Sequence, residues 1–296
     1  MAELKGVITP TITPMNKENP DYEAIDRLMD FLARIGVNGI FPMGSTGLFS
    51  IISMEMEIKV LEYFMDKKRE GMYFLAGVGR NSLDDTLTMG SYAKELGADG
   101  LSIVTPYYVR MSQEALFNYY DKLLGGLDIS VLVYNIPQNT GNSITPETVL
   151  KLRNDHSNLV GIKDSSGNFT DFSQFIDVLG KDFRIFQGQD DLLLPSLIAG
   201  ASGGICGTSN FLDLPVRVYR EHSGQNIEKA RQIQKVLTSV KKFINQYDFP
   251  LGYMAAFMEM ILLRNTETVY PLDNLDADTR KAVKSGIESI INMTEI

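Results

Sequence analysis

The chain of 296 residues is long enough for two average domains or for one large α/β barrel, since single barrels of about 250 residues are common. Its composition, 44% hydrophobic and 22% charged, is that of a globular protein with a large core. A formal net charge of −9 argues against a nucleic-acid partner, because such a partner normally meets a basic face that neutralises its phosphates.

The cysteine content and the N-terminus indicate the compartment. The single cysteine, Cys206, cannot close an internal disulfide, which is typical of a reducing environment. The first residues lack a basic segment followed by an apolar run, and no stretch of about 18 apolar residues occurs. We therefore expect a cytoplasmic protein with no membrane partner.

Short apolar runs alternate with longer helical patterns along most of the chain. Eight runs predict strands at 6–13, 39–43, 73–78, 100–105, 130–136, 159–163, 184–187 and 203–206. The helices predicted after them cover 22–35, 54–69, 83–96, 113–125, 146–153, 170–179, 191–199 and 214–222. Good N-cap residues precede four of these helices: Ser53, Ser82, Ser112 and Thr145.

Eight repeats of strand and helix predict a (β/α)8 TIM barrel over residues 1–225. The alternative is an open doubly wound sheet, but such a sheet usually has fewer strands and a glycine-rich turn after its first strand. From 226 to 296 three helical patterns, near 226–245, 251–264 and 276–293, predict a C-terminal three-helix extension. Tyr253 and its neighbours either fill the core there or line a cleft, and we favour the core.

Lys163 ends the sixth predicted strand, which is otherwise apolar. In a barrel, catalytic groups lie at the carboxyl ends of the strands, and strand alternation puts Lys163 on the same face as the small Gly161. Burial lowers the pKa of a lysine, and the free amine that results can form a Schiff base with a ketone. The alternative is a structural lysine paired with Asp164.

Polar and aromatic groups end the neighbouring strands. Tyr134, at the end of the fifth strand, is either a proton shuttle or a packing residue. The loop 44–47, Gly-Ser-Thr-Gly, either binds a carboxylate or is a plain turn. Tyr107, Tyr108 and Arg110 follow the fourth strand and put two aromatic rings and a cation at the barrel mouth.

Other chemistry lacks the residues that it needs. The only two histidines, His156 and His222, have no metal-ligand spacing, which argues against a metal site and against a serine–histidine nucleophile. The segment 77–79, Gly-Val-Gly, lacks the third glycine of a dinucleotide fingerprint. We expect no cofactor.

Taken together, these loops resemble the dihydrodipicolinate synthase / N-acetylneuraminate lyase family of class I aldolases, which are barrels that form a pyruvate Schiff base on a lysine. The matching motifs, in chain order, are Ile8-Thr9-Pro10, Gly44-Ser45-Thr46-Gly47, Thr105-Pro106-Tyr107-Tyr108, Tyr134-Asn135-Ile136-Pro137, Gly161-Ile162-Lys163-Asp164 and Gly204-Ile205. The six motifs span the whole predicted barrel in the order that the family has.

The resemblance implies roles for the residues at the strand ends. Lys163 would be the Schiff-base residue and Tyr134 the proton-transfer residue, while Thr46 would bind the pyruvate carboxylate. The hydroxyl of Ser45 would link Tyr134 to Tyr108, which in the family reaches in from a neighbouring subunit. The resemblance therefore also implies an obligate dimer, usually paired into a homotetramer.

Departures from the family pattern bear on the substrate. Leu48 replaces the glutamate that usually follows Gly47, and Asn139 lies where the synthases carry an arginine that binds the carboxylate of their aldehyde substrate. With the segment 107–112, these features resemble the archaeal 2-keto-3-deoxygluconate aldolases. Arg110 is similar to an arginine that binds a terminal phosphate in some of these enzymes, and a solvated loop charge is the alternative. Further residues expected to bind the substrate are Pro10, Ser165, Gly188, Gln189, Asp190 and Ile205.

The expected reaction is the reversible cleavage of 2-keto-3-deoxygluconate to pyruvate and glyceraldehyde, and the 6-phosphorylated form is a second expected substrate. One alternative keeps the pyruvate imine but changes the partner, as in dihydrodipicolinate synthase or an N-acetylneuraminate-type lyase. A third hypothesis is a non-catalytic sugar-acid sensor on the same barrel.

Overall fold

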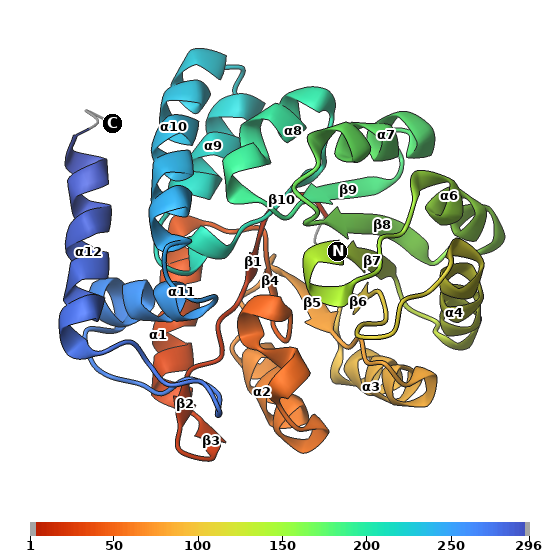
Figure 1. Cartoon of the computed structure of the whole chain (residues 1–296), viewed down its shortest axis with the longest axis horizontal. Coiled ribbons are helices and arrows are strands. Elements are labelled where there is room, and N and C mark those ends of the chain that lie inside the picture. The colour runs from red at the N-terminus through yellow and green to blue at the C-terminus, as the bar shows by residue number, and fades with distance from the viewer. Residues whose placement is uncertain (1–3, 294–296) are drawn as a thin grey trace.

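A closed barrel of eight parallel strands forms the centre of the protein. The structure is a computed structural model, and it describes residues 4–293. The barrel strands are β1 (Gly6–Pro10), β4 (Gly39–Phe41), β5 (Tyr73–Gly77), β6 (Gly100–Val104), β7 (Val131–Asn135), β8 (Leu159–Asp164), β9 (Arg184–Gln187) and β10 (Gly203–Ile205). They are adjacent in the order β1-β10-β9-β8-β7-β6-β5-β4, and helices surround them (Figure 1). The predicted (β/α)8 barrel is confirmed.

The helices around the barrel lie close to where the sequence predicts them. They are α1 (Tyr22–Ile35), α2 (Met54–Asp66), α3 (Leu83–Leu96), α4 (Gln113–Gly126), α6 (Pro146–Asp155), α7 (Phe169–Leu179), α8 (Leu193–Ala199) and α9 (Leu214–Ser223). All four predicted N-cap side chains accept a hydrogen bond from the first turn of their helix, at α2, α3, α4 and α6. Each bond satisfies a backbone N–H that has no partner within the helix.

Two short elements have no counterpart among the sequence predictions. A hairpin of two-residue strands, β2 (Met15–Asn16) and β3 (Asn19–Pro20), follows β1. The short helix α5 (Pro137–Thr140) follows β7 and begins with a proline at its first position. Elements of two to four residues are too short to show a hydrophobic period, so the sequence pattern does not indicate them.

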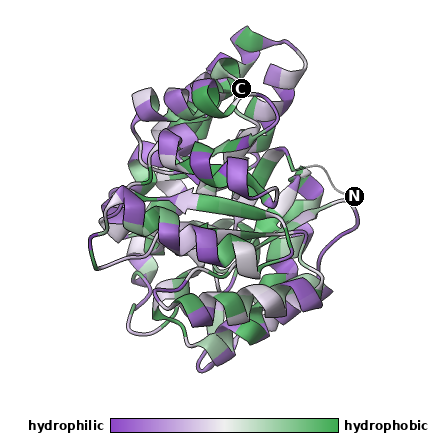
Figure 2. Cartoon of the chain, turned by 90° about the vertical axis from the view of Figure 1, so that its right-hand side faces the viewer, coloured by the Kyte–Doolittle hydropathy of each residue, from purple (hydrophilic) through white to green (hydrophobic). Residues whose placement is uncertain are grey.

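The barrel strands are buried over nearly their whole length. Their interior faces pack against one another and their outer faces pack against the helices, which is why they appear in the sequence as continuous apolar runs. Figure 2 shows hydrophobic residues along the central strands, whereas the surrounding helices carry both hydrophobic and hydrophilic residues. Within residues 4–293, none of the helices has the length and apolar character needed to cross a bilayer.

Three further helical segments lie together on one side of the barrel, coloured blue in Figure 1. They are α10 (Ile227–Ile244), α11 (Leu251–Phe257), which continues as a π-helical turn at Met258–Leu262, and α12 (Ala277–Asn292). The predicted apolar face of α10, including Ile233, Leu237 and Val240, is buried. The division of the chain into units at 226 stays a prediction.

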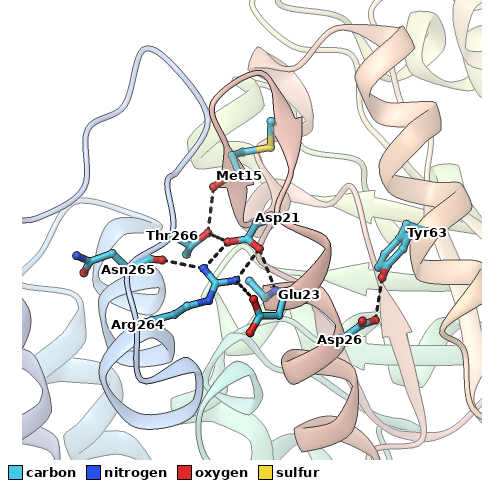
Figure 3. Close-up of polar contacts among 9 residues, drawn as sticks. Met15, Asp21, Glu23, Asp26, Tyr63, Arg264, Asn265 and Thr266 are labelled. Atoms are coloured by element: carbon cyan, nitrogen blue, oxygen red, sulfur yellow. Dashed lines mark hydrogen bonds and ion pairs between the residues drawn. The ribbon is translucent and has the colours of Figure 1, made fainter.

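A half-buried ion pair joins the start of the first helix of the chain to the segment that follows the π-helical turn (Figure 3). Arg264 donates from both terminal nitrogens to the two carboxylate oxygens of Asp21, each over 2.8 Å. Thr266 donates its hydroxyl to the same carboxylate over 2.7 Å, and the backbone N–H of Ala24 donates over 3.1 Å, so Asp21 is also the N-cap of α1. The contacts with Arg264 and Thr266 span more than 240 residues of sequence.

These contacts decide the ionisation of Asp21. Burial by itself would raise the pKa of the carboxyl group, but the hydrogen bonds from Arg264, Thr266 and Ala24 hold that pKa below its ordinary value. A carboxyl whose pKa is lowered by folding stabilises the protein above its unfolded-state pKa. That contribution is lost as the pH falls through the folded-state pKa.

Asp21→Asn keeps an oxygen that caps α1 but removes the charge that pairs with Arg264. We expect the free energy of unfolding at pH 7 to fall by about 2 kcal/mol, the size of one hydrogen bond to a charged group. Urea denaturation at pH 7 and pH 3 would measure this. The deficit should be smaller at pH 3, because below the ordinary pKa of the carboxyl group the unfolded chain takes up a proton and the stabilisation by the lowered native pKa begins to be lost. Glu23→Gln is the control, since Glu23 also contacts Arg264 but its side chain is 66% exposed. An equal deficit at both pH values would contradict the assignment.

Candidate active site

A cavity of about 410 Å³ lies at the carboxyl ends of the barrel strands. Most of the residues that the sequence singles out line it: Pro10, Ser45, Thr46, Tyr134, Lys163, Ser165, Gly188, Gln189, Asp190 and Ile205. These residues come from strand ends or from the loops directly after them, which is where barrel enzymes place their catalytic groups. The roles of the individual residues stay predictions.

Lys163 lies inside the barrel with only 4% of its surface exposed. It pairs directly with Tyr134 in the register between β7 and β8, and its Nζ lies 4.0 Å from the centre of the Tyr134 ring. The ring of Phe41, on β4, is 4.9 Å from the same nitrogen. The aromatic rings therefore shield the amine from water on two sides.

The ion pair between Lys163 and Asp164 that the sequence left open does not form. Adjacent residues of a strand point to opposite faces, and Asp164 is hydrogen-bonded to Asn135 and Ser166 on the outer face. Within the described residues, no carboxylate lies within 4 Å of the Lys163 amine. A buried lysine without an ion-pair partner needs another explanation, and reaction with a substrate is one.

The loop after β4 brings two hydroxyl side chains to the cavity. Residues Ser45–Gly47 form one 3₁₀ turn, and the Ser45 hydroxyl is 3.2 Å from the Tyr134 hydroxyl. The turn is tightly packed, since a Cβ at Gly44 would lie 2.8 Å from the Phe41 ring and one at Gly47 would lie 3.1 Å from the carbonyl oxygen of Thr11. The glycines therefore permit the close approach that puts Ser45 and Thr46 on the cavity wall.

Asp190 lines the cavity, but its carboxylate is engaged within the protein. It accepts hydrogen bonds from the backbone N–H groups of Gly207 and Thr208, over 3.1 and 2.8 Å, and from the Thr208 hydroxyl over 2.5 Å. From α10, the Gln234 side chain donates to the Asp190 carbonyl over 3.0 Å. Asp190 thus ties the ends of β9 and β10 together, and its exposed fraction is only 1%.

The C-terminal helices supply a second lysine to the cavity, which the sequence interpretation missed. Lys241 and Tyr253 both line it, and the Lys241 amine donates to the Tyr253 hydroxyl over 2.7 Å. Burial opposes the charge on Lys241, but the interaction with Tyr253 and the negative charge of Asp190 raise its pKa above the ordinary value. Burial also raises the pKa of Tyr253, to about 12. The site therefore holds a cationic lysine next to a neutral phenol.

A sequence signal for Lys241 exists. It lies four residues after Leu237 and three before Ile244, so helical periodicity places it on the buried face of its helix. Tyr253, which the sequence assigned to the core, is buried and also lines the cavity, whereas Met254 is buried without reaching it. Asn139 and Ile136, which the sequence analysis named for the substrate and in a family motif, also line the cavity. The remaining lining residues, not singled out before, are Gln138, Gly207, Asn245 and Phe249.

Two predicted site residues lie away from this cavity. The Tyr108 side chain is 94% exposed, and its backbone has a φ of 77°, a left-handed conformation that bulky residues rarely adopt. Arg110, two residues further along the same loop, is also exposed. Neither residue lines the cavity of its own chain. Among the residues that the structure describes, no three His, Cys, Asp or Glu side chains lie close enough together to hold a metal ion.

Asp190→Ala leaves two backbone N–H groups and one hydroxyl without their acceptor. We expect the free energy of unfolding to fall by about 3 kcal/mol, since unsatisfied buried donors each cost roughly 1–3 kcal/mol. Asp191→Ala, at the exposed neighbouring position, is the matched control and should change stability by less than about 0.5 kcal/mol. Equal stability of the two variants in urea denaturation would show that Asp190 does not support the β9 and β10 loops.

Known proteins resemble this chain over most of its length. A model of the dihydrodipicolinate synthetase family matches residues 3–290. A 2-dehydro-3-deoxy-D-gluconate/2-dehydro-3-deoxy-phosphogluconate aldolase of Picrophilus torridus is 39% identical over 249 residues, which cover 83% of this chain and 92% of that protein. A 4-hydroxy-tetrahydrodipicolinate synthase of Methanopyrus kandleri is 30% identical over 291 residues, 97% of each chain.

A solved structure shows the same likeness. The 2-keto 3-deoxygluconate aldolase from Picrophilus torridus superposes with a TM-score of 0.88 at 36% identity, and the match covers 93% of this chain and 99% of the other. The family match covers nearly the whole chain, and the relatives match over most of their own length. The chain therefore belongs to the dihydrodipicolinate synthetase family.

Proposed function

We propose that the protein is a class I aldolase that reversibly cleaves 2-keto-3-deoxygluconate to pyruvate and glyceraldehyde. The observation that carries the proposal is the Lys163 amine, which is buried against Tyr134 at the cavity wall and has no ion-pair partner among the described residues. The relative and the solved structure from Picrophilus torridus, which are named as aldolases of this substrate class, support it.

The proposed reaction begins with attack of the Lys163 amine on the C2 carbonyl of the sugar acid, and loss of water gives a protonated imine. In that step the Tyr134 phenol gives its proton to the departing water and becomes a phenolate. The phenolate then takes the proton of the C4 hydroxyl as the C3–C4 bond breaks, and the electron pair moves into the imine to form an enamine. Glyceraldehyde leaves, C3 of the enamine takes up a proton, and hydrolysis of the imine releases pyruvate and the free amine. The hydrogen bond between Ser45 and Tyr134 gives the proton on the phenol a path away from the reacting carbon.

The other lining residues fit the parts of this substrate. We assign the carboxylate of the pyruvate imine to the Thr46 hydroxyl and the backbone at Ser45 and Thr46, because both residues line the cavity in a short turn. We assign the hydroxyl groups of the sugar chain to Ser165 and Gln189, which both line the cavity. A Cβ at Gly188 would collide with the Ser165 side chain, so the glycine lets that side chain keep its position. Pro10 and Ile205 form apolar parts of the wall.

The distal end of the cavity bears on the choice of aldehyde. Gln138 and Asn139, after β7, are uncharged, so this loop offers no cation to the carboxylate of a synthase substrate. Besides the proposed Schiff-base lysine, Lys241 also lines the cavity, and its charge favours a substrate with an anionic far end. The 6-phosphorylated sugar acid is therefore a second proposed substrate, and a synthase or an N-acetylneuraminate-type lyase on the same imine is the alternative.

The proposal extends to assembly as a homotetramer built from two dimers. The exposed ring of Tyr108 is held on a left-handed backbone, whose N–H donates to the Thr140 carbonyl over 3.3 Å. A large aromatic ring presented to solvent in this way suits a contact with another subunit. In the proposed dimer, each Tyr108 reaches the Ser45 and Tyr134 hydroxyls of its partner.

Borohydride reduction in the presence of pyruvate tests the imine. We expect the intact protein to gain the mass of one reduced pyruvate adduct per chain, and Lys163→Ala to gain none. Lys241→Gln is the matched control, because it removes the other lysine of the cavity and should still be trapped. Absence of an adduct in the unsubstituted protein, or its persistence in Lys163→Ala, would contradict the proposal.

Turnover of phosphorylated and unphosphorylated substrate tests the role of Lys241. We expect Lys241→Gln to lower kcat/KM for the 6-phosphorylated sugar acid by about 10- to 100-fold, the size of one charge-assisted hydrogen bond. For the unphosphorylated substrate the loss should be below about threefold, since the glutamine amide still reaches toward Tyr253. Arg110→Ala is measured alongside. If kcat/KM for the phosphorylated substrate falls in Arg110→Ala and not in Lys241→Gln, the phosphate is bound by the loop after β6 and not by Lys241. Preference for aspartate semialdehyde in a panel of aldehydes with pyruvate would favour the synthase alternative.

A further inference from the structure

The residues that follow Tyr134 and Lys163 are bonded to each other on the opposite face of the sheet. The Asn135 side-chain N–H donates to a carboxylate oxygen of Asp164 over 2.6 Å, and the two residues are 2% and 1% exposed. The β7–β8 register pairs Asn135 with Asp164 as it pairs Tyr134 with Lys163. The buried bond is therefore one residue away from the two groups to which we assign the chemistry.

Both partners are held by further bonds. The Asn135 side-chain oxygen accepts from the backbone N–H of Ile144, over 3.2 Å, at the end of the loop that follows β7. The second carboxylate oxygen of Asp164 accepts from the Ser166 hydroxyl over 2.7 Å, in the loop that follows β8. The pair thus joins the ends of two neighbouring strands to the loops that continue from them.

The bonds between the two strand ends require one amide and one carboxylate. Asn135 donates with its nitrogen and accepts with its oxygen, whereas both oxygens of Asp164 accept. A carboxylate buried at this depth is costly unless its oxygens are hydrogen-bonded, and here both are. Rotation of either side chain would break at least one bond, so the two strand ends are held at one spacing.

We propose that Asn135 and Asp164 are a positioning pair, which sets the distance and orientation between the Tyr134 phenol and the Lys163 amine through the ends of β7 and β8. The inference rests on the proposed aldolase function. Neither residue lines the cavity, so the pair acts through its neighbours and does not touch the substrate. Proton transfer tolerates little displacement, and a misplacement of about 1 Å can cost about 100-fold in rate.

A double-mutant cycle tests this pair. Asn135→Asp places two carboxylates within hydrogen-bond distance, where they repel or share a proton, and the strand ends separate. We expect its kcat for 2-keto-3-deoxygluconate to fall about 100-fold while KM stays within about threefold. Asp164→Asn keeps an oxygen that accepts from Asn135 and should lose much less. The exchanged double variant, Asn135→Asp with Asp164→Asn, restores the full set of donors and acceptors and should recover kcat to within about tenfold of the original.

Asn158→Asp separates positioning from simple stability. Asn158 precedes the opposite end of β8, and its side-chain nitrogen donates to the carbonyls of Leu124 and Leu127 over 3.0 and 2.7 Å. This variant should lower the unfolding temperature, as Asn135→Asp does, yet keep kcat in the folded protein. An unchanged kcat in Asn135→Asp, or a double variant no faster than Asn135→Asp, would overturn the positioning role. If the unsubstituted protein forms no pyruvate adduct with borohydride, the proposed aldolase function is contradicted as well. If the adduct forms but the variants of the cycle all keep the original kcat, only the positioning role is contradicted.

Discussion

In the closed barrel, β7 and β8 place Tyr134 directly across from Lys163, and each strand is also hydrogen-bonded to a second neighbour. Tyr134 pairs with Val104 on β6, and Lys163 pairs with Phe186 on β9. A shift of either strand by one residue would turn its whole set of side chains to the other face and would remove the amine or the phenol from the cavity. Because a closed sheet has no free edge, the register of any one strand is constrained by all the others.

The amine inside this barrel is shielded chiefly by aromatic rings. Phe41 and Tyr134 both lie against Lys163, while Asp164, its nearest acid in sequence, is turned to the outer face. Because the two side chains point to opposite faces of β8, a buried acid and a buried lysine follow each other in sequence without forming an ion pair. The acid is satisfied by Asn135 and Ser166, and the amine remains available to a carbonyl carbon.

The C-terminal helices complete both the fold and the cavity. Arg264 ties the segment after the π-helical turn to Asp21, which is the N-cap of α1, so residues near the two ends of the chain support each other. On the cavity side, α10 supplies Lys241 and α11 supplies Tyr253, which bond to each other. The distal part of the cavity therefore depends on elements outside the βα repeats.

The barrel and the strand-end residues could be predicted from the sequence because their signals are local. Strand alternation placed Lys163, and the hydroxyl N-caps of four helices are one-residue features that physical chemistry explains directly. The contacts of Asp21 with Arg264 and of Asp190 with Thr208 could not be predicted in this way, since they join segments that only the folded chain brings together. Lys241 lies between these cases. Its helical spacing from Leu237 and Ile244 predicts that it is on the buried face of the helix, but only the structure shows that it faces the cavity.

Two lysines face this cavity, and the proposed chemistry needs only one of them to react. The most direct measurement is to treat the protein with pyruvate and borohydride, digest it, and locate the reduced adduct by mass spectrometry. The account predicts one modified residue, Lys163, with Lys241 unmodified. An adduct on Lys241 or on any other lysine, or no adduct at all, would contradict it.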